Sequence, residues 1–153
     1  MRKLLVLLVL LPGGILGSLA GFAADTNIVV TGAWLREPPP GMDMAGIYLT
    51  VHNAGVKPLR LIGASSTLAR SATLHESMQS GGMSHMMPLK ALDLPPSASI
   101  EFKPGGRHIM LQGLQHPLHT GDRVPLVLRF ADGAQVAVTA LVAAPNATPN
   151  TTH

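Results

Sequence analysis

Cysteine is absent from all 153 residues of the sequence. This absence excludes disulfide bonds, thiolate zinc sites and the blue-copper electron-transfer site, because each of them requires cysteine sulfur. It also leaves no residue for lipid attachment through a thiol. An exported domain of this composition must therefore be stabilised by its hydrophobic core alone.

Aromatic and charged residues are also scarce, at 3% and 12% of the sequence. No cluster of lysine and arginine and no aromatic platform is present, so we expect no nucleic-acid partner. Clustered oxygen ligands for calcium or magnesium are missing as well. We find no Gly-x-Ser-x-Gly motif, no phosphate-binding loop and no convincing pair of carboxylates, and we therefore do not expect an enzyme.

The N-terminal segment has the order of a secretory signal peptide. Arg2 and Lys3 precede an apolar run over residues 4–11, and small residues follow up to Ala24. The run is shorter than the roughly 20 residues of a membrane span, so we expect no stable membrane insertion after cleavage. We assign residues 1–24 to this signal, with Ala20, Ala23 and Ala24 as possible ends. A retained N-terminal anchor is the alternative.

Residues 25–143 read as one domain of short strands separated by turn residues. Strands are expected at 27–35, 45–53, 58–65, 70–76, 88–93, 98–103, 107–112, 124–130 and 135–143. Asp132-Gly133 predicts a hairpin between the last two. This spacing predicts an all-β Greek-key sandwich or barrel. We expect Trp34 and Tyr48 in its core, and the polar, proline-containing residues 144–153 as a disordered tail.

Two histidines and two methionines stand out as candidate metal ligands. In a strand over residues 107–112, His108 and Met110 project from the same face, and a loop carrying His75 and Met86 could close over them. Thioether sulfur is a soft, uncharged donor that favours Cu(I), and imidazole also suits copper. These four residues therefore point to a Cu(I) site.

The spacing H-x10-M-x21-H-x-M resembles that of the periplasmic copper chaperones of the PCuAC type. The similarity extends over roughly residues 27–143 and includes the segments 34–53, 103–114 and 121–130. The resemblance implies a cupredoxin-like β-barrel in the periplasm that acts as a monomer and binds one Cu(I) at an exposed site. Its implied recipient is the copper centre of cytochrome c oxidase, or the assembly chaperone that loads that centre. The implied ligands are His75, Met86, His108 and Met110.

Several points stay open at this stage. A copper-sequestering protein of tolerance would share the site without the delivery role. The residues between the motif positions, Met78, Met83, His85 and Met87, are expected in a loop over 77–87 whose opening allows ligand exchange; they are alternate ligands, a partner-binding surface or residues of no special role. Met42 and Met44 are expected to pack or line the rim of the site. The tail offers only His153 as a copper ligand, and whether it forms a second copper site, for Cu(II), is also open.

Overall fold

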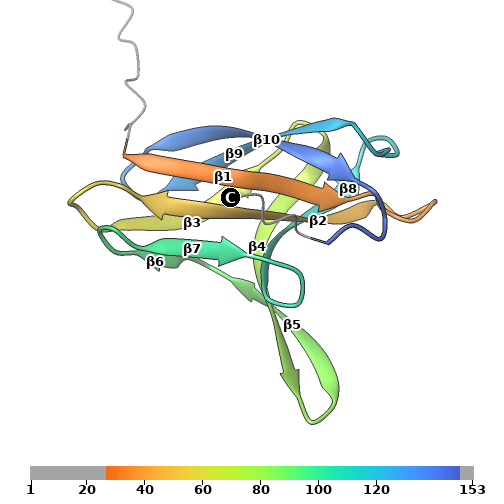
Figure 1. Ribbon diagram of the computed structural model, residues 1–153, viewed down its shortest axis with the longest axis horizontal. Coiled ribbons are helices and arrows are strands. Elements are labelled where there is room, and N and C mark those ends of the chain that lie inside the picture. The colour runs from red at the N-terminus through yellow and green to blue at the C-terminus, as the bar shows by residue number, and fades with distance from the viewer. Residues whose placement is uncertain (1–26, 149–153) are drawn as a thin grey trace, which may run out of the picture.

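Residues 27–148 form a closed β-barrel with three additional strands in the computed structural model (Figure 1). The predicted signal peptide and residues 149–153 of the predicted tail lie outside the described residues. No helix within residues 27–148 is long and apolar enough to cross a membrane. The all-β barrel predicted from the strand pattern is confirmed.

Ten strands make up the described chain. They are β1 (Ile28–Arg36), β2 (Met44–Asn53), β3 (Leu59–Ser65), β4 (Ala69–Ser80), β5 (Met83–Leu89), β6 (Leu92–Leu94), β7 (Ser99–Phe102), β8 (Arg107–Leu114), β9 (Arg123–Phe130) and β10 (Gln135–Ala143). Neighbours run in the order β3, β4, β8, β2, β1, β10 and β9, and β9 pairs again with β3, which closes the ring. The β1–β10 pair is parallel and the other pairs are antiparallel.

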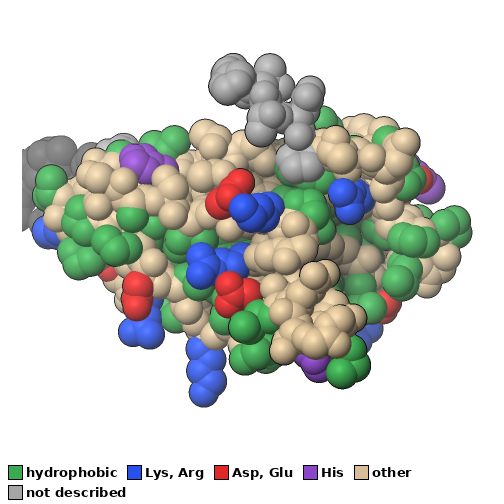
Figure 2. Space-filling view, turned by 60° about the horizontal axis from the view of Figure 1, so that its bottom comes forward, with side chains coloured by type: hydrophobic (Ala, Val, Ile, Leu, Met, Phe, Trp, Pro, Cys, Tyr) green, Lys and Arg blue, Asp and Glu red, His purple; other side chains and the backbone are tan. Residues whose placement is uncertain are grey.

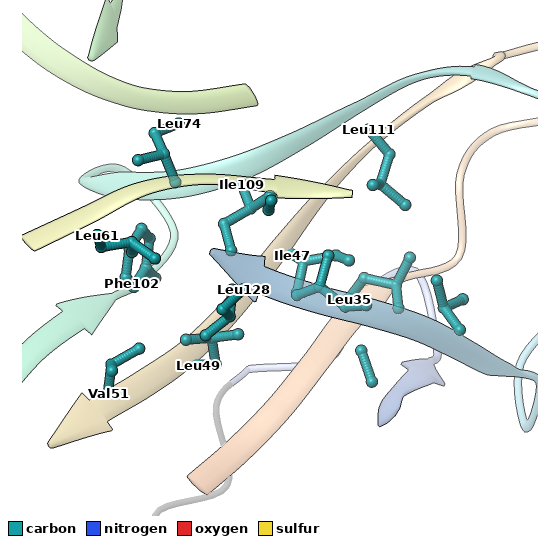
Figure 3. Packing of buried hydrophobic residues seen from close by; sticks show 14 of the residues in the cluster. Leu35, Ile47, Leu49, Val51, Leu61, Leu74, Phe102, Ile109, Leu111 and Leu128 are labelled. Carbon is teal, nitrogen blue, oxygen red and sulfur yellow. The ribbon is translucent and has the colours of Figure 1, made fainter. Parts of the chain in front are cut away.

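The interior of the barrel is filled by the alternating apolar residues of these strands. In β9, for example, every second residue from Val124 to Phe130 is buried. Figure 3 shows how Ile47, Leu111, Leu128 and their neighbours from different strands meet inside. Each such side chain stabilises the fold by about 1.5–3 kcal/mol when fully buried. Residues on the outward face of the same strands are thereby left available for a site.

The segment 77–87 differs from the prediction. It is not a loop, because β4 continues to Ser80 and pairs residue by residue with β5. Gly81 and Gly82 join the two strands with φ angles of 60° and 79°, which is the conformation of a type I′ turn. We call residues 77–87 the arm, since Figure 1 shows this hairpin extending away from the barrel.

The described beginning of the predicted tail lies against the barrel. The backbone N–H of Ala147 donates to the carbonyl of Ala144 at 2.9 Å. The Nε of Arg36, at the end of β1, donates to the carbonyl oxygen of Ala147 at 2.8 Å. Residues 144–148 are therefore held next to β1, and the disorder predicted for the rest of the tail stays a prediction.

Candidate metal centre

His75 and His108 face each other across two neighbouring strands. They are directly opposite in the antiparallel pairing of β4 with β8. Their ring centroids lie 5.7 Å apart and the ring planes are inclined by 38°. Two imidazoles that bind one ion through nitrogen bonds of about 2 Å place their centroids roughly 6 Å apart. The pair thus has the separation that a shared metal ion requires.

One nitrogen of each ring is already held by the protein. The Nδ1–H of His108 donates to the carbonyl oxygen of Gly106 at 3.1 Å, which fixes the tautomer with a lone pair on Nε2. The Nε2 of His75 lies 2.9 Å from the hydroxyl of Thr73. When the Nε2–H of His75 donates to this hydroxyl, the lone pair of the ring is on Nδ1.

The two remaining nitrogens are buried without a hydrogen-bond partner. They are Nδ1 of His75 and Nε2 of His108. Leaving a buried polar atom unsatisfied costs about 1–3 kcal/mol, so such atoms are rare in native proteins and call for an explanation. A metal ion bound between the two rings would satisfy both of them at once.

The pKa of His75 is lowered, mainly by burial and secondly by the nearby charge of His108 in its protonated form. A lowered pKa keeps the imidazole of His75 neutral at neutral pH. Only the neutral ring can bind a metal, so little proton displacement is required at this ligand.

Both candidate thioethers lie on the same face as the two rings. Met110 follows His108 by two residues in β8 and is paired with Thr73, itself two residues before His75. Met86 is on β5, opposite Ser77, and its side chain is 56% exposed. Three of the four positions therefore belong to the barrel wall, and the fourth belongs to the arm. The structure places the four predicted ligand positions on one face of three adjacent strands.

Gly46 leaves room beside this face. It pairs with Met110 from strand β2, and a Cβ atom at this position would lie 3.3 Å from the hydroxyl oxygen of Tyr48 and 3.8 Å from Cδ2 of His108. Tyr48 also stacks at a tilt on Trp34, with ring centroids 5.0 Å apart. Both aromatic residues are half-buried rather than buried, so their predicted place in the core is wrong. They lie on the outer wall, where Tyr48 and His108 both approach Gly46.

The remaining described residues offer no conventional metal cluster. Residues 27–148 contain no group of three or more His, Cys, Asp or Glu side chains that could hold a metal. A metal centre here must therefore use methionine sulfur together with the histidine pair. Met44 lies on the same face, diagonal to Met110, which fits the rim position expected for it.

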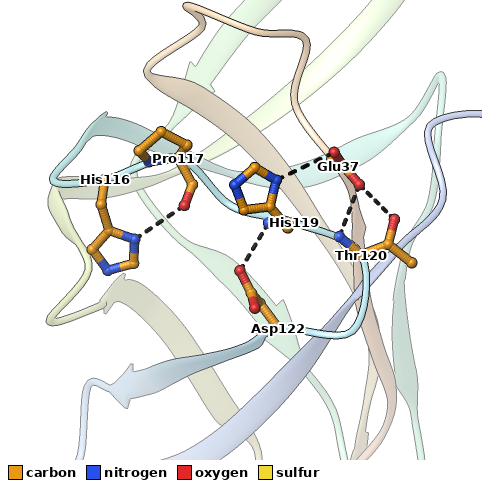
Figure 4. A network of polar contacts seen from close by, with 6 residues as sticks. All are labelled: Glu37, His116, Pro117, His119, Thr120 and Asp122. Carbon is orange, nitrogen blue, oxygen red and sulfur yellow. Dashed lines mark hydrogen bonds and ion pairs between the residues drawn. The ribbon is translucent and has the colours of Figure 1, made fainter.

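In the 115–122 loop, His119 belongs to a separate polar network, and His116 lies 3.1 Å from the carbonyl oxygen of Pro117 (Figure 4). His119 lies 3.6 Å from Glu37, whose carboxylate accepts hydrogen bonds from the hydroxyl and the backbone N–H of Thr120. The side-chain hydrogen bond from Thr120 is the largest cause of the lowered pKa of Glu37. Asp122 in turn accepts from the backbone of His119. This network anchors a loop and shares no residue with the candidate centre.

Two supports of the centre were not recognised from the sequence. Thr73 and Gly106 each precede a histidine by two residues, and both orient the ring that follows. Thr73 and His75 lie two residues apart on β4 and share a face, so T-x-H was a usable signal. Gly106 precedes β8 and acts through its backbone carbonyl, which no residue type marks in a sequence. Recognising the pair of Thr73 and His75 required knowing that this segment is a strand.

The chain is similar to known proteins over most of its length. The model of a family described as putative lipoprotein LpqE-like matches residues 28–142. The putative lipoprotein Lxx21020 of Leifsonia xyli subsp. xyli is 36% identical over 115 residues, which cover 74% of this chain and 68% of that protein.

Solved structures of similar fold come from copper-binding domains. The copper-bound PCuAC domain from PmoF2 superposes with a TM-score of 0.67 at 30% identity, covering 81% of this chain and 97% of that domain. The solution structure of CuI-DR1885 from Deinococcus radiodurans gives a TM-score of 0.62 at 32% identity, covering 86% and 85%. The resemblance to PCuAC-type proteins predicted from the sequence is thereby confirmed.

Proposed function

The chain belongs to the LpqE-like family, and from this premise we propose that it is a copper chaperone that binds one Cu(I) ion and passes it on. The proposed ligands are His75, Met86, His108 and Met110. The observation that carries the proposal is the pair of buried, partnerless imidazole nitrogens between β4 and β8. Two similar structures, a copper-bound PCuAC domain and CuI-DR1885, support copper as the cargo.

The donor set determines which ion it suits. Two neutral imidazoles and two neutral thioethers bring no negative charge to the site. They therefore suit a monovalent ion, whose single positive charge the solvent can balance. Soft sulfur donors select Cu(I) over zinc and over the hard cations calcium and magnesium. Methionine also remains a ligand in an oxidising compartment where free thiols would pair.

Delivery is proposed to proceed by ligand exchange without a change of redox state. Met86 is the most exposed of the four ligands and is held on the arm rather than in the barrel wall. A thiolate or thioether of a recipient can replace it first, and stronger thiolate donors then draw the ion away. The proposed recipient is the copper centre of cytochrome c oxidase or the chaperone that loads that centre.

Export to the periplasm forms part of the proposal. It is supported by the charged, apolar and small-residue order of residues 1–24. It is also supported by the description of the family and of the Leifsonia relative as putative lipoproteins.

A competition titration against a chromophoric Cu(I) chelator tests the ligand set. The full chain should bind one tight equivalent, and Met86→Leu/Met110→Leu should lose it although leucine preserves the apolar volume. His85→Gln is the matched control, because His85 lies on the arm but points to its opposite face. An equal loss of Cu(I) affinity in both variants would show that the site does not lie on the proposed face.

A second assay separates delivery from sequestration. The copper-loaded protein is mixed with the soluble copper-binding domain of the oxidase, and metal transfer is followed by the absorption of the recipient. Transfer faster than spontaneous release into an excess chelator supports the chaperone. Retention of copper by the donor would instead favour a role in copper tolerance.

A further inference from the structure

We propose that the arm carries a second Cu(I) site on the face turned away from the four-ligand centre. Its ligands are drawn from Met78, Met83, His85 and Met87. That a soft-metal site exists there is argued from the arm alone, whereas the choice of Cu(I) as its occupant rests on the proposed function.

The pairing of β4 with β5 puts these residues on one face. Met78 is directly opposite His85, Ser80 is opposite Met83, and Glu76 is opposite Met87, with no irregularity in the ladder. Side chains alternate between faces along a strand, and directly opposed residues share a face. Met86 and His75 therefore occupy one face of this hairpin. The opposite face carries Met78, Met83, His85 and Met87.

Packing does not account for these methionines. Their side chains are 52%, 64% and 51% exposed at positions 78, 83 and 87, and none of them belongs to the hydrophobic core. In the space-filling view, hydrophobic and histidine side chains lie next to each other at the surface near the bottom of the molecule (Figure 2). Exposing three large apolar side chains together to water is unfavourable, and an exposed apolar patch of this kind marks an interaction or ligand-binding site.

The spacing suits a small, soft ion. The Cβ atoms of directly opposed residues such as Met78 and His85 lie about 4.5–5.5 Å apart, and diagonal neighbours such as Met78 and Met87 lie within reach of long side chains. Methionine has three rotatable side-chain bonds and adapts to the ion it meets. Met83 and Met87 lie four residues apart on β5, about 13 Å, so one ion can reach only one of them. The imidazole of His85 with two thioethers, from Met78 and either Met83 or Met87, can thus close around Cu(I).

The charge around this face also fits a weakly held monovalent ion. Glu76, at the base of the arm, is engaged by Arg107 of β8, with Nε and Oε1 at 3.2 Å. The contact has the distance of an ion pair but not the angles of a hydrogen bond. With its carboxylate paired in this way, the face offers neutral donors. With a single imidazole, and with every ligand exposed, it should bind more weakly than the four-ligand centre.

The two sites would lie back to back on the same hairpin. Met86 and Met87 are consecutive residues on opposite faces of β5, which is an edge strand of the sheet. An ion held by Met87 can therefore reach Met86 around this edge by exchanging one thioether for another. No electron transfer is needed, since copper remains Cu(I) throughout. The far face of the arm would serve to collect incoming copper.

Methyl NMR of the full chain, labelled at the methionine methyl groups and titrated anaerobically with Cu(I), tests the inference. In the wild type, the first equivalent should shift the methyl signals of Met86 and Met110. The second equivalent should shift those of Met78 and Met87. A Met78→Leu/Met83→Leu/Met87→Leu variant should keep the first event and lose the second, and a Met42→Leu variant is the matched control that should keep both.

The Met86→Leu/Met110→Leu protein distinguishes failure of this inference from failure of the proposed function. Shifts of the arm methyls in this variant support the second site, whether or not the four-ligand assignment is correct. Unmoved arm methyls after two equivalents overturn it. Loss of the first, tight event in the triple variant also overturns it, because the arm residues would then belong to one shared site. The ring signals of His85, followed in the wild type, give a readout that needs no substitution.

Discussion

Replacing the two glycines of the arm should weaken copper binding without unfolding the barrel. Gly81 and Gly82 have φ angles of 60° and 79°, and an added Cβ atom would meet no other atom within 4 Å at either position. The effect of alanine at these positions is therefore purely conformational. It arises because residues with a side chain disfavour positive φ.

The size of the effect follows from that conformational preference. A left-handed conformation costs an ordinary residue roughly 1–2 kcal/mol, so Gly81→Ala/Gly82→Ala should strain the turn by about 2–4 kcal/mol. The backbone N–H of Ser77 donates to the carbonyl oxygen of Gly106, and the residues of the arm beyond Ser77 pair only within the hairpin. The strain should consequently open the arm and remove Met86 from the centre. The loss in Cu(I) affinity should reach at most roughly 30- to 1000-fold, since about 1.4 kcal/mol corresponds to tenfold.

Two measurements and one control define the experiment. Amide hydrogen exchange should rise over residues 77–87 and remain unchanged in β8, while Cu(I) affinity falls in a chelator competition. Gly81→Asn is the control, because Asn-Gly is a favoured type I′ turn and should preserve both the pairing and the affinity.

An alanine variant with normal arm protection and normal affinity would refute this account of the turn. An opened arm with normal affinity would show that Met86 is not a ligand. The loop over residues 77–87 that was expected from the sequence would give a different outcome, in which only the rate of copper transfer responds to the replacement.

Three further outcomes are expected. In the metal-free protein, unfolding free energy should fall as pH drops from about 6.5 towards the lower folded pKa of His75, since the unfolded chain binds the extra proton there; thermal melts of His75→Gln should show a shallower dependence. Gly46→Ala should displace the Tyr48 hydroxyl and lower Cu(I) affinity modestly, whereas the melting temperature should hardly change. Leu128→Ala should cost about 2–5 kcal/mol in urea unfolding, with the affinity of the folded protein retained.

The sequence predicted the barrel well because its strands alternate in hydrophobicity. Strand β9 shows this most clearly, since each buried residue from Val124 onward is followed by one that is at least partly exposed. The turn at Asp132-Gly133 was also recognised correctly, and Gly133 has the positive φ of 90° that favours glycine. Local patterns of this kind depend only on neighbouring residues, so one sequence is sufficient to read them.

The arm was missed because its residues are not typical of strands. Met83 to Met87 include no β-branched residue, and Pro88 cannot donate to a ladder. The strand is possible because β5 is at the edge of the sheet. One side of β5 has no neighbouring strand, so the missing N–H of Pro88 interrupts no hydrogen-bond ladder there. The Gly81-Gly82 pair was the signal that should have indicated a two-residue hairpin. Without that hairpin, the division of the methionines between two faces was not predictable.

The position of the candidate centre on the outer wall explains how a domain can release a metal and stay folded. In β8, Ile109 and Leu111 face the core while His108 and Met110 face outward, so binding and core packing use alternate residues of the same strand. The imidazoles are oriented by Thr73 and Gly106 before any ion arrives, which limits the rearrangement that binding requires. Met86 alone depends on the arm. Exchange should therefore begin at the arm and end at the histidines, because the ligand with the fewest contacts to the barrel is the easiest to displace.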